Sequence, residues 1–285
     1  MKTDRAKTDS AKTDTAKAAR VKTARVVYGG AVHEATEAQP DDAGHGHLRL
    51  ADGRVVGETQ VMWLAPFEPR TLFALALNYA DHALELAAKS SAEQGRFLQA
   101  QHAEPIVFLK GANSVVGHRG FTPRPADGEL MHYECELAVV IGRTARHIKK
   151  ADAYDFIAGY SVANDYAIRD YLENWYRPNL RVKNRDTCTP IGPWLVDAAD
   201  VPNPMALKLQ TTVNGQVTQS GSTADMIFDV PTLIEYFSSF MTLNPGDLIL
   251  TGTPDGVVNV NPGDVIVTEI EGIGALINTI VAACA

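Results

Sequence analysis

Short apolar runs separated by Gly, Pro, Asn and Asp dominate the chain. The clearest runs cover residues 73–77, 106–109 and 135–141. Each run is long enough for a buried strand and too short for a typical helix. Because such runs recur at short spacing with turn residues between them, the pattern predicts a mainly β protein with a few short helices.

Turn signals agree with this prediction. Asn214-Gly215 stands between two strand-like segments and predicts a hairpin with a type I′ turn. Asn-Pro-Gly-Asp occurs at 244–247 and again at 261–264, each time before an aliphatic segment. Both copies therefore predict a turn that leads into a strand.

Two segments favour helices. A short helix is predicted over residues 151–159, followed by a strand over 160–163. A longer helix is predicted over 230–241, where Pro231 occupies the first turn, a position at which helices tolerate proline.

The pattern divides the chain into three parts. Residues 1–22 form a low-complexity pentad repeat with no large apolar side chain between Met1 and Val21, which predicts a disordered tail. A weak electrostatic contact of this tail with RNA or an acidic partner is the alternative. Residues 23–69 contain short strand-like pieces broken by Gly and Asp and predict a small β-rich module. Residues 70–285 are predicted to form the large domain that carries the chemistry.

Composition narrows the class of protein. The 285 residues are 45% apolar and 21% charged, an ordinary globular composition. The net charge is −8, but residues 1–25 carry +5 and the rest −13, and an acidic body argues against nucleic-acid binding. The chain has no apolar run near the ~20 residues of a membrane span and no apolar segment typical of a secretory signal. Its three cysteines lack a CxxC spacing, so neither a disulfide framework nor a zinc site is expected. We therefore expect a soluble cytoplasmic protein.

Paired acids supply the most informative candidate site. Glu134 and Glu136 flank Cys135 in a predicted strand, so both carboxylates project to one face while the thiol projects to the other. Together with Asp165 they would repel one another unless a cation neutralises them. An all-oxygen set of ligands favours Mg²⁺ or Mn²⁺ over zinc. A solvated strand face is the alternative interpretation.

Three further features suggest chemistry. His82 and Glu85 are three residues apart, so the carboxylate can orient the imidazole as a general base; a surface polar pair is the alternative. Lys183 lies in the cationic stretch 177–186 and can stabilise a developing negative charge, unless it is simply solvated. The Gly-rich turn 251–256 can hold a carboxylate, or can be a plain turn.

Taken together, these features resemble the fumarylacetoacetate hydrolase superfamily. The resemblance runs from about residue 72 to residue 281 and rests on five segments in the superfamily's order: 78–82, 108–110, 132–137, 159–165 and 251–256. The stretch 167–186 is similar to members that act as decarboxylases in homoprotocatechuate degradation.

The resemblance implies a fold, a cofactor and a set of site residues. The fold is a fumarylacetoacetate hydrolase-like β-roll, the cofactor is Mg²⁺ or Mn²⁺, and the protein is a homodimer that acts on a small oxo-carboxylate. The implied site residues are the metal ligands Glu134, Glu136 and Asp165, the catalytic residues His82, Glu85 and Lys183, and the substrate-binding residues Arg169 and Thr253.

Three functions remain open from the sequence. The first is a metal-dependent decarboxylase and/or isomerase of an unsaturated 2-oxo di- or tricarboxylate in aromatic-compound catabolism. The second is a metal-dependent C–C hydrolase of acylpyruvates or diketo acids, in which His82 and Glu85 activate water. The third is a scaffold without catalytic activity. Residues 86–104 exceed the superfamily's usual connection by about ten residues, either as a longer lid or as a surface insertion.

Overall fold

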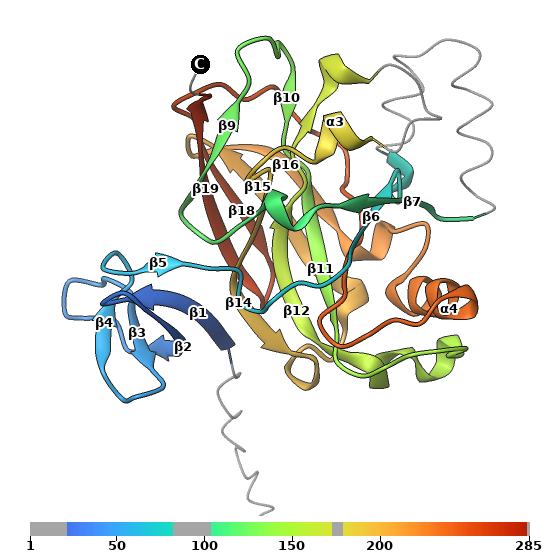
Figure 1. The fold of residues 1–285 in the computed structure, drawn as a ribbon, viewed down its shortest axis with the longest axis horizontal. Coiled ribbons are helices and arrows are strands. Elements are labelled where there is room, and N and C mark those ends of the chain that lie inside the picture. The colour runs from blue at the N-terminus through green and yellow to red at the C-terminus, as the bar shows by residue number, and fades with distance from the viewer. Residues whose placement is uncertain (1–21, 82–103, 173–178, 284–285) are drawn as a thin grey trace, which may run out of the picture.

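The computed structural model describes residues 22–81, 104–172 and 179–283 (Figure 1). Strands make up most of its regular structure and helices are few and short, which confirms the predicted fold class. Within these ranges, no helix is long and apolar enough to cross a bilayer.

The largest sheet has twelve strands. Ten of them follow the order β4-β3-β2-β1-β14-β12-β11-β17-β6-β7, while β5 pairs with β1 and β8 with β14. Their bounds are β1 Lys22–Tyr28, β2 Ala31–Ala38, β3 His47–Leu50, β4 Val55–Gly57, β5 Met62–Trp63, β6 Leu72–Ala76, β7 Ile106–Lys110, β8 Val115–Val116, β11 Cys135–Ile141, β12 Ile157–Asn164, β14 Thr189–Asp197 and β17 Leu248–Leu250.

A second sheet has five strands in the order β16-β15-β18-β19-β9, and β10 pairs with β13 separately. The β15–β16 connection confirms the predicted hairpin, because Asn214 and Gly215 have φ of 52° and 80°, as a type I′ turn requires. The bounds are β9 Gly120–Arg124, β10 Met131–His132, β13 Ala167–Ile168, β15 Lys208–Val213, β16 Gln216–Ser222, β18 Val265–Ile270 and β19 Gly274–Ala282.

The main hydrophobic core lies between these two sheets. Every residue of β11 is buried, which explains why its sequence is apolar at every position except Glu136. Leu137 and Val139 of β11 share a cluster with Leu209, Ile270 and Leu276 of the five-stranded sheet. A strand that is buried on both faces at the centre of the sheet is a rigid support for the side chains at its ends.

The helix α4 (Val230–Phe240) confirms the longer predicted helix. Asp229 caps it by accepting a hydrogen bond from the Thr232 N–H at 2.9 Å, and Phe237 packs against Phe73 of β6 with ring centroids 4.8 Å apart. The other helical segments that lie wholly within the described ranges are α3 Leu180–Lys183 and the 3₁₀ turns Ala112–Ser114, Lys150–Phe156, Arg169–Tyr171, Ala198–Asp200, Pro204–Ala206 and Thr223–Asp225.

The short helix predicted over 151–159 is only partly correct. The segment is a 3₁₀ helix over Lys150–Phe156, and β12 already begins at Ile157. Ile157 pairs with Ile141 of β11, so sheet pairing competes with the helix and ends it early. The strand predicted over 160–163 is confirmed as part of β12.

The N-terminal strands β1–β5 stand to one side of the molecule (Figure 1). They enclose their own apolar cluster, which includes Val26, Leu50 and Trp63, yet β1 also pairs with β14 of the large sheet. Lys22, the last residue of the predicted tail, begins β1, and residues 1–21 lie outside the described part of the chain. The division at residue 69 stays a prediction.

His118 lies where the N-terminal strands meet the rest of the protein, and it is predicted to make the protein's stability depend on pH. Its ring packs edge-on against Trp63 at 4.8 Å, and its Nδ1 accepts a hydrogen bond from the Ile277 N–H at 3.1 Å. Burial, with a smaller contribution from Arg119, lowers the pKa of His118 to about 3. An unfolded histidine has a pKa of about 6.5, so the unfolded chain binds a proton in the window between these values and the folded chain does not.

We therefore expect His118 to make the protein less stable as the pH falls below about 6.5. Below about pH 6.5, His118 should lower the free energy of unfolding by up to ~1.4 kcal/mol for each pH unit. Urea unfolding at pH 7.5 and pH 5 measures this effect. Between these pH values, the free energy of unfolding should fall by about 2 kcal/mol less in His118→Asn than in wild type. Identical losses in the two proteins would contradict the neutral, buried imidazole.

Candidate functional site

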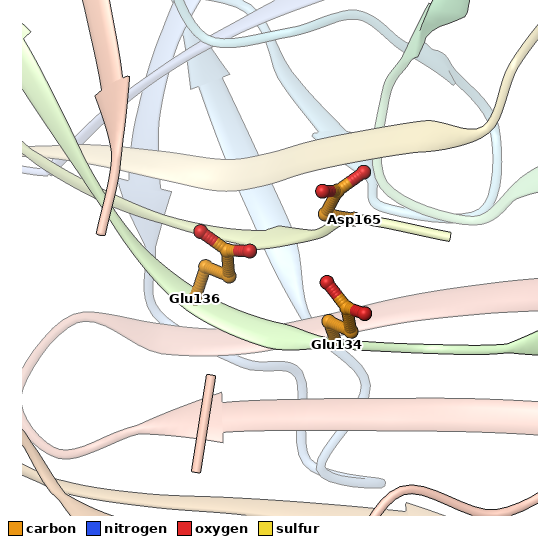
Figure 2. A group of neighbouring side chains, drawn as sticks. All are labelled: Glu134, Glu136 and Asp165. Carbon is orange, nitrogen blue, oxygen red and sulfur yellow. The ribbon is translucent and has the colours of Figure 1, made fainter. Parts of the chain in front are cut away.

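Three carboxylates meet where β11 begins and β12 ends. Cys135 of β11 pairs with Asn164 of β12, and the Asp165 N–H donates to the Glu134 carbonyl at 2.9 Å. This register brings Glu134 and Glu136 next to Asp165, with one oxygen of each carboxylate within 4.8 Å of the others. Figure 2 shows the three side chains pointing toward one another.

These carboxylates are buried. Their residues are 6%, 0% and 0% exposed for Glu134, Glu136 and Asp165, respectively. Cys135 points away into the main core, as strand alternation predicts. The burial rules out a solvated strand face, so the three negative charges need compensation inside the protein.

Two cations named by the sequence prediction provide part of that compensation. The Lys183 Nζ donates to Glu134 Oε2 at 2.5 Å and to Asp165 Oδ2 at 2.8 Å. The Arg169 Nη2 donates to Glu134 Oε1 at 2.5 Å. Lys183 is only 4% exposed, which rules out the solvated lysine.

Lys110 is a third cation of the site, and sequence reasoning assigned it no role. Its Nζ forms a buried ion pair with Asp165 and donates to the Lys183 carbonyl at 2.5 Å. Burial disfavours the charged amine, but the surrounding acidic groups, chiefly the Asp165 carboxylate with Cys188 and Glu134, together outweigh this effect and raise the pKa of Lys110. One signal was available: Lys110 is two residues from Phe108 in an apolar strand, so both side chains point to one buried face.

Lys110→Met is expected to destabilise the metal-free protein by about 3 kcal/mol, because it leaves part of the Asp165 charge buried without its partner. Chemical denaturation would measure the loss. Lys149→Met is the matched control, since the Lys149 side chain is 79% exposed and its replacement should change stability by less than about 0.5 kcal/mol. A loss for Lys110→Met as small as that of the control would refute the pairing.

Glu136 has the most unusual surroundings. Its Oε2 accepts a hydrogen bond from the Gly252 N–H at 2.6 Å, whereas its Oε1 has no hydrogen-bond partner in the described structure. Burial raises the pKa of the Glu136 carboxyl well above its usual range, and the neighbouring Asp165 and Glu134 raise it further. A buried carboxylate oxygen without a partner is costly unless a cation binds it.

The turn over residues 251–256 reaches Glu136 because β17 pairs with β11. Gly252 has φ of 87°, and a Cβ at this position would lie 2.9 Å from the Asn78 Cβ. The Asn78 Nδ2 also donates to the Thr251 carbonyl at 2.8 Å. Glycine is therefore needed here both for its backbone conformation and for the close approach of residue 78.

The donor set fits a hard divalent cation. All three candidate ligands are carboxylates, they converge, and Glu136 offers an oxygen with no other partner in the described residues. Such oxygen ligands suit Mg²⁺ or Mn²⁺, whereas zinc sites prefer nitrogen and sulfur.

The remaining predicted residues fall into two groups. Thr253 is buried beside Gly252, and its Oγ1 accepts a hydrogen bond from the Gln219 Nε2 at 2.9 Å. His82 and Glu85 lie outside the described residues, as does most of the longer connection over 86–104.

Comparison with known proteins gives concordant matches. Residues 71–281 match the family described as "Fumarylacetoacetate (FAA) hydrolase C-terminal". The 4-hydroxyphenylacetate degradation bifunctional isomerase/decarboxylase of Salmonella dublin is 56% identical over 211 residues, which cover 74% of this chain and 47% of the relative. The protein of the same name from Escherichia coli is 52% identical over 82% of this chain and 52% of its own length. The chain thus spans about half the length of these relatives.

Solved structures support the fold assignment. A 5-carboxymethyl-2-hydroxymuconate delta-isomerase from Mycobacterium smegmatis matches with a TM-score of 0.77 and 34% identity, covering 93% of this chain and all of the other. A 2-hydroxyhepta-2,4-diene-1,7-dioate isomerase from Mycobacterium marinum matches with the same TM-score, identity and coverage. The expected fold is confirmed by these matches.

Proposed function

The chain belongs to the fumarylacetoacetate hydrolase family, and we propose that it is a divalent-metal-dependent decarboxylase and/or isomerase of an unsaturated 2-oxo di- or tricarboxylate. The buried triad of Glu134, Glu136 and Asp165, surrounded by cations, is the observation that carries the proposal. The names of the relatives from Salmonella dublin and Escherichia coli place their reactions in 4-hydroxyphenylacetate degradation, which supports the substrate class.

In this proposal Glu134, Glu136 and Asp165 hold Mg²⁺ or Mn²⁺. When bound, the ion supplies electrostatic stabilisation of the negative charge that develops on the 2-oxo group. Glu136 is held in place for this role by the Gly252 N–H and by the rigid strand β11.

Lys183 stabilises the same developing charge. Decarboxylation breaks the bond to the departing carboxylate and leaves its electron pair on the substrate, where it moves toward the 2-oxo oxygen as CO₂ is released. A buried ammonium group fixed by two carboxylates needs no reorganisation to face this charge, which is the arrangement that gives large electrostatic effects.

Arg169 and Thr253 bind the remaining substrate carboxylates and so orient the bond that breaks. His82 and Glu85 transfer a proton to or from the substrate carbon, which completes the decarboxylation or carries out the isomerisation. These four roles rest on the family resemblance, and Arg169 is further supported by its contact with Glu134.

The proposal extends to the protein's setting. We infer a cytoplasmic homodimer that binds a small oxo-carboxylate and interacts with neither nucleic acid nor membrane. The acidic charge of residues 26–285 supports the first exclusion. Residues 70–285 form the catalytic domain in this proposal, in agreement with the family match over 71–281.

The test is metal-dependent turnover. After EDTA treatment, the protein should release CO₂ from 5-oxopent-3-ene-1,2,5-tricarboxylate or oxaloacetate no faster than buffer does, and added Mg²⁺ or Mn²⁺ should restore release well above the rate with the ion alone. Ketonisation of 2-hydroxyhepta-2,4-diene-1,7-dioate, followed by absorbance, reports isomerase activity separately. If no ion restores either reaction, the proposal is wrong.

A hydrolase from the same family is the alternative function. A fumarylacetoacetate hydrolase from Exiguobacterium antarcticum matches with a TM-score of 0.76 and 32% identity, so this fold also accommodates a protein named for that reaction. Turnover in ¹⁸O-labelled water separates the two: a hydrolase cleaves acylpyruvates and incorporates the label into a product carboxylate, whereas the decarboxylase releases CO₂ without consuming water.

A further inference from the structure

Gln219 is a buried polar residue that hydrogen-bonds to the Thr253 hydroxyl. Gln219 of β16 is 1% exposed and Thr253 is 3% exposed. The Gln219 Nε2 donates to Thr253 Oγ1 at 2.9 Å and to the Pro254 carbonyl at 2.8 Å. Its Oε1 accepts a hydrogen bond from Thr211 Oγ1 at 3.3 Å.

The partners of this amide determine its orientation. The Pro254 carbonyl can only accept a hydrogen bond, so the nitrogen of Gln219 must face it. The same nitrogen contacts Thr253, whose hydroxyl oxygen therefore acts as the acceptor. The hydroxyl proton of Thr253 is consequently directed away from Gln219.

A second set of contacts holds Gln219 in this orientation. Thr211 lies opposite Gln219 in the β15–β16 hairpin and opposite Thr268 of β18. The Thr268 hydroxyl accepts a hydrogen bond from Asn164 Nδ2 at 2.9 Å, which leaves its proton for the Thr211 hydroxyl 3.3 Å away. Because all of these side chains are buried, reversing the amide would leave polar groups unsatisfied.

Other contacts already hold the backbone of the turn. The Thr251 Oγ1 donates to the Leu137 carbonyl at 3.0 Å, and the Gly252 N–H donates to Glu136. The turn therefore does not depend on Gln219 alone. What Gln219 adds is an N–H donor at Thr253, which makes the Thr253 hydroxyl oxygen an acceptor and leaves its proton free.

We propose that Gln219 is a positioning residue that directs the Thr253 hydroxyl proton toward a substrate carboxylate. This inference rests on the proposed role of Thr253 in carboxylate binding. A carboxylate only accepts hydrogen bonds, so a hydroxyl with its donor free binds it and a hydroxyl whose proton is used elsewhere does not.

Gln219→Glu tests the proposal because it preserves size and reverses the group that meets Thr253. The new carboxyl oxygen accepts the Thr253 hydroxyl proton and withdraws it from the substrate. We expect the KM for 5-oxopent-3-ene-1,2,5-tricarboxylate to rise about tenfold while kcat changes by less than about threefold. The affinity of the Mg²⁺-loaded protein for propane-1,2,3-tricarboxylate, a probe that cannot be decarboxylated, should fall by a similar factor in titration calorimetry.

A double-mutant cycle separates positioning from folding. In a Thr253→Val background, Gln219→Glu should produce no further change in probe affinity, because no hydroxyl remains to be directed. Gln210→Glu, on the exposed face of β15, is the matched control and should leave affinity unchanged. Unfolding curves with Mg²⁺ identify the folded variants, and Gln219→Met supplies a second variant without a carboxyl group: it should weaken probe binding only when Thr253 is present.

Three outcomes would overturn the inference: equal losses of affinity with and without the Thr253 hydroxyl, unchanged affinity in folded Gln219→Glu, or no binding of the probe by wild type. If wild type binds the probe but turns over no substrate, the proposed activity fails. The cycle of probe affinities then still decides the role of Gln219.

Discussion

Methionine in place of Lys183 is expected to lower kcat about a thousandfold while leaving metal binding intact. The ammonium group lies within 2.8 Å of both Glu134 and Asp165, in a buried site where a fixed charge stabilises a transition state by about 3–4 kcal/mol. Removing it takes a positive charge away from both carboxylates, so a divalent cation is held at least as tightly. Steady-state kinetics at saturating Mg²⁺ or Mn²⁺, together with metal analysis of the same samples, would measure both effects.

The control for this experiment is Lys208→Met, which changes an exposed lysine at the start of β15. It should retain wild-type kcat. A Lys183→Met protein that is folded, loaded with metal and as active as wild type would remove Lys183 from the mechanism. Loss of metal together with activity would instead give Lys183 a role in building the site.

Glu136→Gln is expected to weaken metal binding at least a hundredfold and to lower activity about a thousandfold. The substitution keeps the shape of the side chain but removes a charged ligand whose Oε1 has no hydrogen-bond partner in the described structure. In the metal-free protein it removes repulsion from Glu134 and Asp165, so stability should stay the same or rise. Thermal unfolding with and without Mg²⁺ or Mn²⁺ measures the loss of metal binding and the stability of the metal-free protein, and it needs no substrate.

Wild type should melt at a higher temperature as the ion is added, because an ion that binds only the folded state stabilises it. That increase should disappear in Glu136→Gln. Glu269→Gln on the exposed face of β18 is the control and should retain it. An equal metal-induced increase in wild type and Glu136→Gln would show that the triad does not bind the ion. If added ion does not raise the melting temperature of wild type, the result would favour the third function, a scaffold without catalytic activity.

Local sequence predicted most of the strands because their signals are local. Mainly apolar runs predicted β6, β7 and β11, and Asn214-Gly215 predicted the β15–β16 turn. The prediction of a helix over 151–159 was wrong at its C-terminal end because the deciding contact is not local. Ile157 pairs with Ile141 sixteen positions away along the chain, and no local pattern contains that partner.

The candidate site divides in the same way. Glu134 and Glu136 were predicted to share a face because strand geometry has a period of two residues. Asp165 and Lys183 were named for their side-chain chemistry, and the family resemblance added Arg169 and Thr253. Their burial, and the choice between a solvated face and an enclosed site, required the packing of β11 against two neighbouring strands.

By itself, the sequence determined the mainly β character of the protein and the shared face of Glu134 and Glu136, since both depend on side-chain type and short spacing. Only the tertiary structure decided that Lys110 compensates Asp165 and that Gln219 faces Thr253. These residues are 55 and 34 positions apart, respectively. Such pairs meet because sheet register brings distant strands together, and their energies depend on exclusion of water, which a linear pattern does not contain.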